Sequence, residues 1–354
     1  MANNSDISET QLLLAYGDVI CTNLLMDRTT QQNIYWATDS YAEKGMGYTF
    51  FDPITIDKIT GENDLMIRPR AVKSKEEQEL RVRDKAEVFT PSWICNAQNN
   101  LIDEAWFGRK EGLFNFQDPD NPISWINNEE RIVFPEGKTW KDYVADMRLE
   151  ITCGEAPYLV NRYDAVTGDY NDNVKFRIGM LDRKLRIVSE NAKDSKEWIL
   201  WGKIALRSTY GFEWQGDNLL LAREAIFFTF AEHYIEQFGE KKFNLNKSRM
   251  MPDVSYIISW NIWQMDGLKF GLPGYEPYIE EKKEQNLKQF SLFDDTDFFD
   301  VQEEEHVVKP HEKLCIIKDF LEGVNLKKAT LSKQDFQDYK APILTFESLV
   351  NKNK

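Results

Sequence analysis

Residues 150–159 of the chain read EITCGEAPYL, and this stretch has the pattern of a strand that ends in a tight turn. Residues 148–152 form a short strand candidate, and Cys153 and Gly154 open a turn, because glycine lets the backbone bend sharply. A turn of small residues after a strand can present backbone N–H groups to a polar ligand. We therefore expect this stretch to place a ligand site at the end of a strand.

Apolar spacing along the rest of the chain predicts strands and helices in alternation. Apolar residues recur at helical spacing in 92–105, in about 178–210 and in 218–238, and the charged run 73–85 is also helical in character. The segment 210–213, YGFE, is predicted as a second strand end and 255–259, SYIIS, as a third strand. This alternation predicts an α/β fold with a mainly parallel sheet, helices on both faces, and ligand sites at the carboxyl ends of the strands.

The composition indicates a folded, acidic protein. Of the 354 residues, 42% are hydrophobic and 13% aromatic, and long disordered chains are poor in aromatic residues. The formal net charge of -15 has the wrong sign for general attraction to DNA, so DNA contact would need a local basic patch or a partner subunit. Scattered cysteines and a start unlike a signal peptide predict a cytoplasmic protein, and no apolar run approaches the ~20 residues of a membrane-spanning helix.

Shifts in composition divide the chain into four predicted regions. Residues 1–85 are turn-rich and are predicted to form an N-terminal cap, and residues 86–275 hold the alternating core. Residues 276–308 are polar and are predicted to be a flexible acidic linker, since 293–305 carries many carboxylates and no basic residue. Residues 309–354 regain a weak pattern of short elements and form a small C-terminal segment.

The 150–159 turn and the two segments around it follow a known order. In amino-methyltransferases this turn reads Asp-Pro-Ala-Cys-Gly-Ser-Gly-x-Phe-Leu. Here Glu150 takes the acidic position, Cys153 and Gly154 match Cys-Gly, and Ala156 takes the position of the second glycine. Upstream, 88–91 reads VFTP, which matches a Phe-Thr-Pro element, and downstream Glu213 matches the acid that binds the ribose hydroxyls.

With these elements the chain resembles the N6-adenine DNA methyltransferases of the gamma order that serve as subunit M of restriction-modification systems. The resemblance covers about residues 87–267 and implies a Rossmann-like class I methyltransferase fold. It implies an S-adenosyl-L-methionine site formed by Phe89, Thr90, Pro91, Glu150, Cys153, Gly154, Ala156 and Glu213. The departures are Ile151 for proline, Glu155 for serine and Ala156 for glycine, and an ordinary strand-to-loop turn with a buried cysteine is the alternative interpretation.

The catalytic tetrapeptide of that family, Asn/Asp-Pro-Pro-Tyr, does not occur in this sequence. The candidate in the corresponding order is 259–267, SWNIWQMDG. Asn261 would accept the hydrogens of the target amine, Trp263 would stack on a flipped base, and Asp266 would be a further acceptor. The alternative is that the tryptophans of this segment are core or interface residues.

Three classes of function follow. The first is methyl transfer from S-adenosyl-L-methionine to an exocyclic amine of double-stranded DNA, adenine N6 or else cytosine N4. The second is a methyltransferase-like subunit that binds cofactor or DNA without transfer, consistent with the missing tetrapeptide. The third is a magnesium-dependent restriction nuclease, in which Glu213 and Gln215 would act with an upstream acid such as Asp182 or Glu190.

A short peptide in the acidic region suggests a further partner. Residues 289–293, QFSLF, resemble the pentapeptide that binds the bacterial sliding clamp, with Gln289, Leu292 and Phe293 as anchors. The alternative is a hydrophobic patch that packs the tail onto the core. A restriction or specificity subunit is a second expected partner. The three histidines show no metal-ligand spacing, so we predict no metal site.

Overall fold

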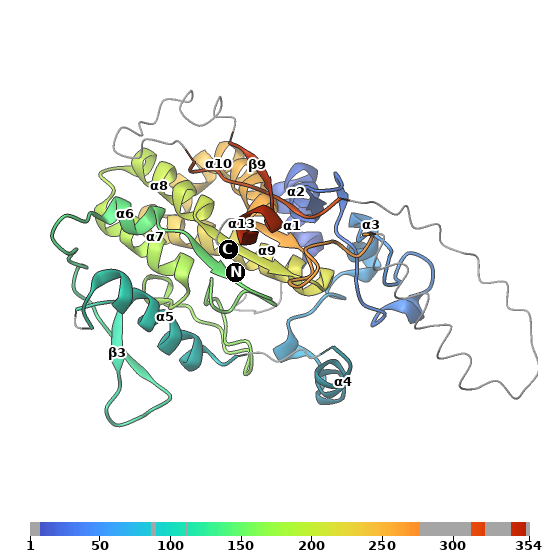
Figure 1. The fold of residues 1–354 in the computed structure, drawn as a ribbon, viewed down its shortest axis with the longest axis horizontal. Coiled ribbons are helices and arrows are strands. Elements are labelled where there is room, and N and C mark those ends of the chain that lie inside the picture. Colours follow the sequence, from blue (N-terminus) through green and yellow to red (C-terminus); the bar gives the residue numbers. More distant parts are fainter. Residues whose placement is uncertain (1–7, 86–89, 111, 276–312, 323–340, 352–354) are drawn as a thin grey trace, which may run out of the picture.

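The computed structural model describes residues 8–85, 90–110, 112–275, 313–322 and 341–351. Over these ranges the protein is a mixture of helices and strands built around a small parallel sheet of three strands (Figure 1). The sheet consists of β5 (Arg148–Glu150), β6 (Thr209–Glu213) and β7 (Ile262–Gln264), in that spatial order. The described strands form no closed barrel.

Four helices connect the strands and cover one face of the sheet. The helices α7 (Met180–Asn191) and α8 (Ser195–Arg207) lie between β5 and β6, and α9 (Gly216–Phe238) and α10 (Glu240–Asn261) lie between β6 and β7. Because the spatial order of the strands equals their chain order, both right-handed crossovers return over the same face. The main hydrophobic core therefore lies between these helices and that face.

The opposite face of the sheet is covered by the C-terminal part of the chain. Tyr210, Phe212 and Trp263 point to this side and form a second buried cluster with residues of β8 (Ile316–Lys318), β9 (Ile343–Thr345) and α13 (Phe346–Asn351). The ring of Phe346 lies 5.8 Å from those of Phe212 and Trp263, centre to centre. Most of this cover is an antiparallel strand pair, where we expected crossover helices on both faces.

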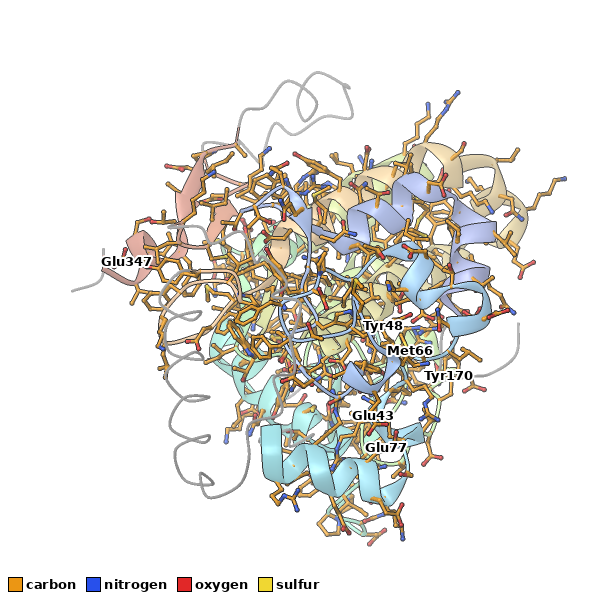
Figure 2. The ribbon with its side chains drawn as sticks, turned by 90° about the vertical axis from the view of Figure 1, so that its right-hand side faces the viewer. Glu43, Tyr48, Met66, Glu77, Tyr170 and Glu347 are labelled. Atoms are coloured by element: carbon orange, nitrogen blue, oxygen red, sulfur yellow. The ribbon has the colours of Figure 1, made fainter. Side chains whose placement is uncertain are left out.

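The N-terminal region shares the main core. It contains α1 (Glu9–Tyr16), α2 (Asp18–Leu25), the strand pair β1 (Met26–Asp27) and β2 (Gln32–Asn33), α3 (Ile56–Ile59), α4 (Lys75–Lys85), and the 3-10 turns Ala42–Lys44, Gly61–Asn63 and Arg70–Val72. Helix α2 packs on α10, and Leu24 and Trp36 are fully buried in the main cluster. Figure 2 labels Tyr48 and Met66 in this region, and Glu347 of α13 lies at the opposite side of that view. The region is thus an integral layer of the fold.

Residues 92–150 are attached to the core through α7. They form α5 (Ser92–Phe107), the strand pair β3 (Asn115–Gln117) and β4 (Trp125–Asn127), and α6 (Trp140–Ala145), and a 3-10 turn (Val174–Phe176) precedes α7. Three basic side chains of α7, those of Arg183, Lys184 and Arg186, are buried. Arg183 pairs with Asp103 of α5 at 2.6 Å, Lys184 donates to the carbonyl of Asp146, and Arg186 donates to carbonyls next to β4.

The predicted strand at residues 255–259 is wrong, because these residues lie inside α10. Met251, Val254 and Ile258 fall at helical spacing and are buried on one side, so a short apolar run was assigned the wrong period. The third strand starts only at Ile262. The predicted helices 92–105 and 218–238 and the first two strands are confirmed. The predicted helical tract 178–210 is two helices, because Asp194 caps the start of α8.

Candidate functional site

The carboxyl ends of β5 and β6 carry two neighbouring acidic side chains, as the sequence predicts. The Glu213 carboxylate accepts hydrogen bonds from the Gly154 N–H at 2.9 Å and from the Gln215 N–H at 3.1 Å. The Cys153 N–H donates to the carbonyl of Phe212 at 2.8 Å. The glycine turn after β5 is therefore held against the end of β6, and Gly154 has a φ of +53° that glycine accommodates without strain.

Glu150 ends β5 with a buried carboxyl group. Its Oε1 atom lies 3.4 Å from the Tyr158 nitrogen, and its Oε2 atom has no hydrogen-bond partner among the described residues. Burial raises the pKa of this carboxyl well above its usual value, the Tyr158 and Leu159 N–H groups oppose the rise, and the charge of Glu213 adds to it. A buried carboxyl oxygen without a partner is an acceptor, or when protonated a donor, for a polar ligand group.

The Thr-Pro element lies against the same turn. The Cys95 thiol donates to the carbonyl of Thr90 at 3.6 Å, and the side chains of Thr90 and Cys95 also interact with the Tyr158 hydroxyl. Helix α5 begins directly after Pro91, and Asn99 on this helix donates to the carbonyl of Tyr158 at 3.0 Å. Phe89 lies outside the described residues. Thr90 and Pro91 thus flank the turn from the side of α5.

Three residues of the turn point into the protein. Cys153 and Ala156 are buried in the main core, and burial raises the pKa of the Cys153 thiol well above its usual value. The carboxylate of Glu155 accepts from the Arg70 N–H and from the Tyr163 hydroxyl, both at 2.6 Å. Glu155 therefore ties the turn to the N-terminal region, and this contact accounts for a carboxylate at a position where the resemblance has none.

The structure separates the three predicted catalytic residues. Asn261 is the last residue of α10 and precedes β7, so it lies at the amino end of the sheet, and its amide donates to the carbonyls of Leu206 and Thr209 at 2.8 and 3.1 Å. Trp263 is buried in the second cluster. Asp266 follows β7 at the carboxyl end and accepts the N–H groups of its own turn. The wrong period assigned to 255–259 is what placed Asn261 at a strand end.

The carboxyl end of β7 is filled by the N-terminal region, which sequence reasoning missed. The Gln264 amide exchanges two 2.9 Å hydrogen bonds with the backbone of Tyr35, and the Gly216 N–H donates to the carbonyl of Trp36 at 2.9 Å. A glutamine in a strand is not a specific signal, so the sequence pattern did not predict this contact. The strand order of the described sheet also has no reversal, the point where ligands of open α/β sheets commonly bind. The N-terminal region therefore covers the carboxyl end of β7 and leaves Glu150 and Glu213 as the acids at the ends of β5 and β6.

The acids of the nuclease hypothesis have other partners. Asp182 contacts His233 at 3.0 Å and accepts the Asn161 N–H at 2.7 Å, and Glu190 pairs with Arg186 at 2.8 Å. Within the part of the chain that the structure describes, no group of three or more His, Cys, Asp or Glu residues could hold a metal ion. The clamp-binding peptide with Gln289, Leu292 and Phe293 lies outside the described residues.

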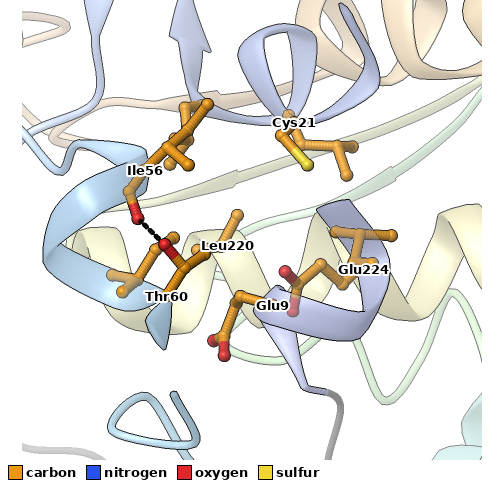
Figure 3. Close-up of a pocket in the computed structure, with 10 residues that line it drawn as sticks. Glu9, Cys21, Ile56, Thr60, Leu220 and Glu224 are labelled. Atoms are coloured by element: carbon orange, nitrogen blue, oxygen red, sulfur yellow. Dashed lines mark hydrogen bonds between the residues drawn. The ribbon is translucent and has the colours of Figure 1, made fainter. Parts of the chain in front are cut away.

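Two hollows lie away from the strand ends. One is a small cavity of about 10 Å³ between α1, α2, α3 and α9, and apolar side chains line it together with Glu9, Cys21, Thr60 and Glu224 (Figure 3). Burial and the charge of Glu224 raise the pKa of Cys21 to about 12. The other is an open groove of about 390 Å³ along α4, lined by Arg70, Lys75 and Arg83 among others. This groove adjoins the glycine turn through the Arg70–Glu155 contact.

No described helix has the length and apolar character needed to cross a membrane. Comparison with protein-family models, with curated protein sequences and with solved structures found no match for this chain.

Proposed function

We propose that this protein is a methyltransferase-like subunit that binds S-adenosyl-L-methionine at the β5–β6 end of a Rossmann-like sheet. The observation that carries the proposal is the hydrogen bond from the Gly154 N–H to Glu213, since it brings together two elements that lie 59 positions apart. Thr90 reaches the same turn through the Tyr158 hydroxyl, and Asn99 of α5 reaches it through the Tyr158 carbonyl. Three segments chosen from the sequence alone thus meet at one edge.

The residues at this edge fit the chemistry of the cofactor. Its ribose offers hydroxyl donors, and the Glu213 carboxylate, with four lone-pair sites, can accept one more bond beyond the N–H groups of Gly154, Trp214 and Gln215. Its amino group is a donor of the kind that the unsatisfied Glu150 Oε2 atom accepts. Thr90 and Pro91 would flank the cofactor from α5. When bound, the cofactor supplies an electrophilic methyl group.

The groove along α4 supports DNA as the partner. Arg70, Lys75 and Arg83 give this surface a local excess of positive charge in a protein of net charge -15, and Glu79 is the acidic residue among its lining. Contacts of lysine and arginine with phosphates supply most of the sequence-independent affinity for DNA. In this proposal the subunit works in a restriction-modification system, together with a restriction or specificity subunit.

Binding without methyl transfer has the better support of the two methyltransferase hypotheses. The amide hydrogens of Asn261 are used by two carbonyls at the amino end of the sheet, away from Glu150 and Glu213. A transferring enzyme needs an acceptor for the target amine beside the methyl group. Transfer to adenine N6 would therefore require a residue from the partner subunit.

Calorimetry with S-adenosyl-L-methionine tests the proposal. We expect wild type to bind and Glu150→Ala to bind more weakly, by roughly tenfold, because the variant lacks the carboxyl group that would bond to the amino group of the cofactor. The matched control is Glu240→Ala, at an exposed acid at the start of α10. A wild type that does not bind would contradict the proposal. Transfer of a labelled methyl group to mixed DNA by the isolated protein would restore the active-enzyme hypothesis.

A further inference from the structure

Asp217 is a fully buried carboxylate in the first turn of α9. It accepts hydrogen bonds from Arg81 Nη2 at 2.8 Å and from the Tyr41 hydroxyl at 3.0 Å. Arg81 Nη2 also lies 3.4 Å from the side-chain oxygen of Gln215, so it contacts the turn that follows Glu213. A buried carboxylate that loses its cation destabilises a protein strongly, because the remaining charge is uncompensated. Separation of Arg81 from Asp217 is therefore unfavourable unless another cation takes its place.

Helix α4 depends on this contact for its attachment to α9. Among the side chains of α4 that the structure describes, only that of Arg81 is buried, and those of Lys75, Glu79, Val82 and Arg83 are exposed. Figure 1 shows α4 at the margin of the molecule, apart from the larger helices. A helix of 11 residues is marginally stable in water on its own. We therefore expect α4 to lose its order when Arg81 leaves α9.

A second cation, Lys73, lies near the same carboxylate without a hydrogen bond. Lys73 is 8% exposed, and its Nζ atom has no hydrogen-bond partner among the residues that the structure describes. Burial raises the pKa of Asp217, but the charges of Arg81 and Lys73 outweigh this effect and hold it below its usual value. Lys73 is thus within electrostatic reach of Asp217. A buried ammonium group without a hydrogen bond is unfavourable, so its presence requires an explanation.

Lys73 and Arg81 lie in parts of the chain that differ in attachment. Lys73 follows the 3-10 turn Arg70–Val72, which the Arg70 N–H ties to the glycine turn. Gln78 in the first half of α4 donates to the carbonyls of Arg70 and Lys73, so this half is fixed to the same turn. Arg81 lies in the second half of α4. When the second half moves away from α9, Arg81 leaves Asp217 and Lys73 remains beside it.

We propose that α4 is a latched cover of the turn after Glu213, and that Arg81 and Lys73 alternate as the partner of Asp217 when this cover closes and opens. In the closed state, which the structure shows, Arg81 binds the carboxylate. In the open state Lys73 donates to Asp217 instead, so the buried charge is compensated in both states. Opening exposes the turn beside Glu213 and moves the basic groove that α4 lines. The movement does not depend on cofactor binding, so its test is separate from that of the proposed function.

Amide hydrogen exchange in residues 79–83 tests the latch, with the amides of α9 as the internal reference for global unfolding. We expect Arg81→Met to raise the exchange rates by roughly tenfold or more, because α4 loses its anchor. Lys73→Met should lower them by roughly threefold or more, because opening then leaves Asp217 without a cation. Lys241→Met, at an exposed lysine of α10, is the matched control and should leave the rates unchanged.

The sign of the Lys73→Met effect distinguishes the latch from a static ion pair. If Lys73 only stabilised the closed state through Asp217, its loss would speed exchange in α4. In the background of Asp217→Asn, which removes the charge that both cations compensate, Lys73→Met should have little further effect. Faster or unchanged exchange in Lys73→Met, unchanged exchange in Arg81→Met, or an undiminished Lys73→Met effect in the Asp217→Asn background would each overturn the proposal.

Discussion

At the scale of single residues, Glu150 is an acid that the sequence pattern places at a strand end and whose burial lowers the stability of the protein. Its carboxyl group is buried at the end of β5, beside the charge of Glu213, and one of its oxygens has no hydrogen-bond partner among the described residues. A native protein retains such a group when it serves a ligand or a partner, because an unsatisfied buried oxygen lowers stability. The proposed cofactor site uses this residue.

The raised pKa of Glu150 predicts a pH dependence of stability. A carboxyl whose pKa is raised by folding binds more protons in the folded state than in the unfolded state. Its contribution to the free energy of unfolding is therefore present below the unfolded pKa near 4.5 and is lost as the pH rises through the folded pKa. We therefore expect the free energy of unfolding of Glu150→Gln, measured in urea, to rise relative to that of wild type between about pH 4.5 and pH 8. The difference should grow by up to about 1.4 kcal/mol per pH unit. A constant difference between Glu150→Gln and wild type across this range would contradict this expectation.

At the scale of elements, the start of α9 depends on a glycine. Residues 35–36 of the N-terminal region cross the strand ends at this point, and a Cβ atom at Gly216 would lie 1.9 Å from the Tyr35 carbonyl oxygen. The backbone must shift if that space is filled, because neither atom belongs to a flexible side chain. The contact fixes the N-terminal region over β6 and β7, and thereby closes that part of the edge.

Gly216→Ala should accordingly destabilise the protein, by about 1–3 kcal/mol, in denaturant unfolding. Helix propensity alone predicts the opposite sign, since alanine is the better helix former. Glu236→Ala, an exposed substitution in the same helix, serves as the control and should change stability little. A Gly216→Ala variant as stable as wild type would show that the N-terminal region is not held at this point.

At the scale of the whole molecule, segments distant in sequence complete both sides of one small sheet. The helices between the strands and the N-terminal region cover one face, and residues 315–317 and 344–349 cover the other. Three short strands cannot bury both faces with their own connections when all crossovers return over one side. The C-terminal segment is therefore required for the stability of the sheet.

Phe346→Ala tests this dependence. The ring of Phe346 contacts the rings of Phe212, Trp263 and Phe270 at 5.5–5.8 Å between centres. We expect a loss of about 2 kcal/mol in the free energy of unfolding, because the side chain is only partly buried, together with a small red shift of the total tryptophan fluorescence, since Trp263 becomes more exposed to water. Val350→Ala, at an exposed position of the same helix, is the control. Unchanged stability and fluorescence in Phe346→Ala would mean that the C-terminal cover is dispensable.

The sequence by itself determined the helices with long apolar periodicity, the first two strands, and the acids that end them. These features depend on local spacing, which the chain carries in every conformation. Tertiary structure decided the rest. Residues 255–259 are helical in the folded protein. A run of five apolar and small residues is compatible with the period of a helix or of a strand, and only the packing of the run decides between them. Tertiary structure also turned Glu155 and Gln264 toward the N-terminal region, because hydrogen bonds between distant segments form only when the chain has folded.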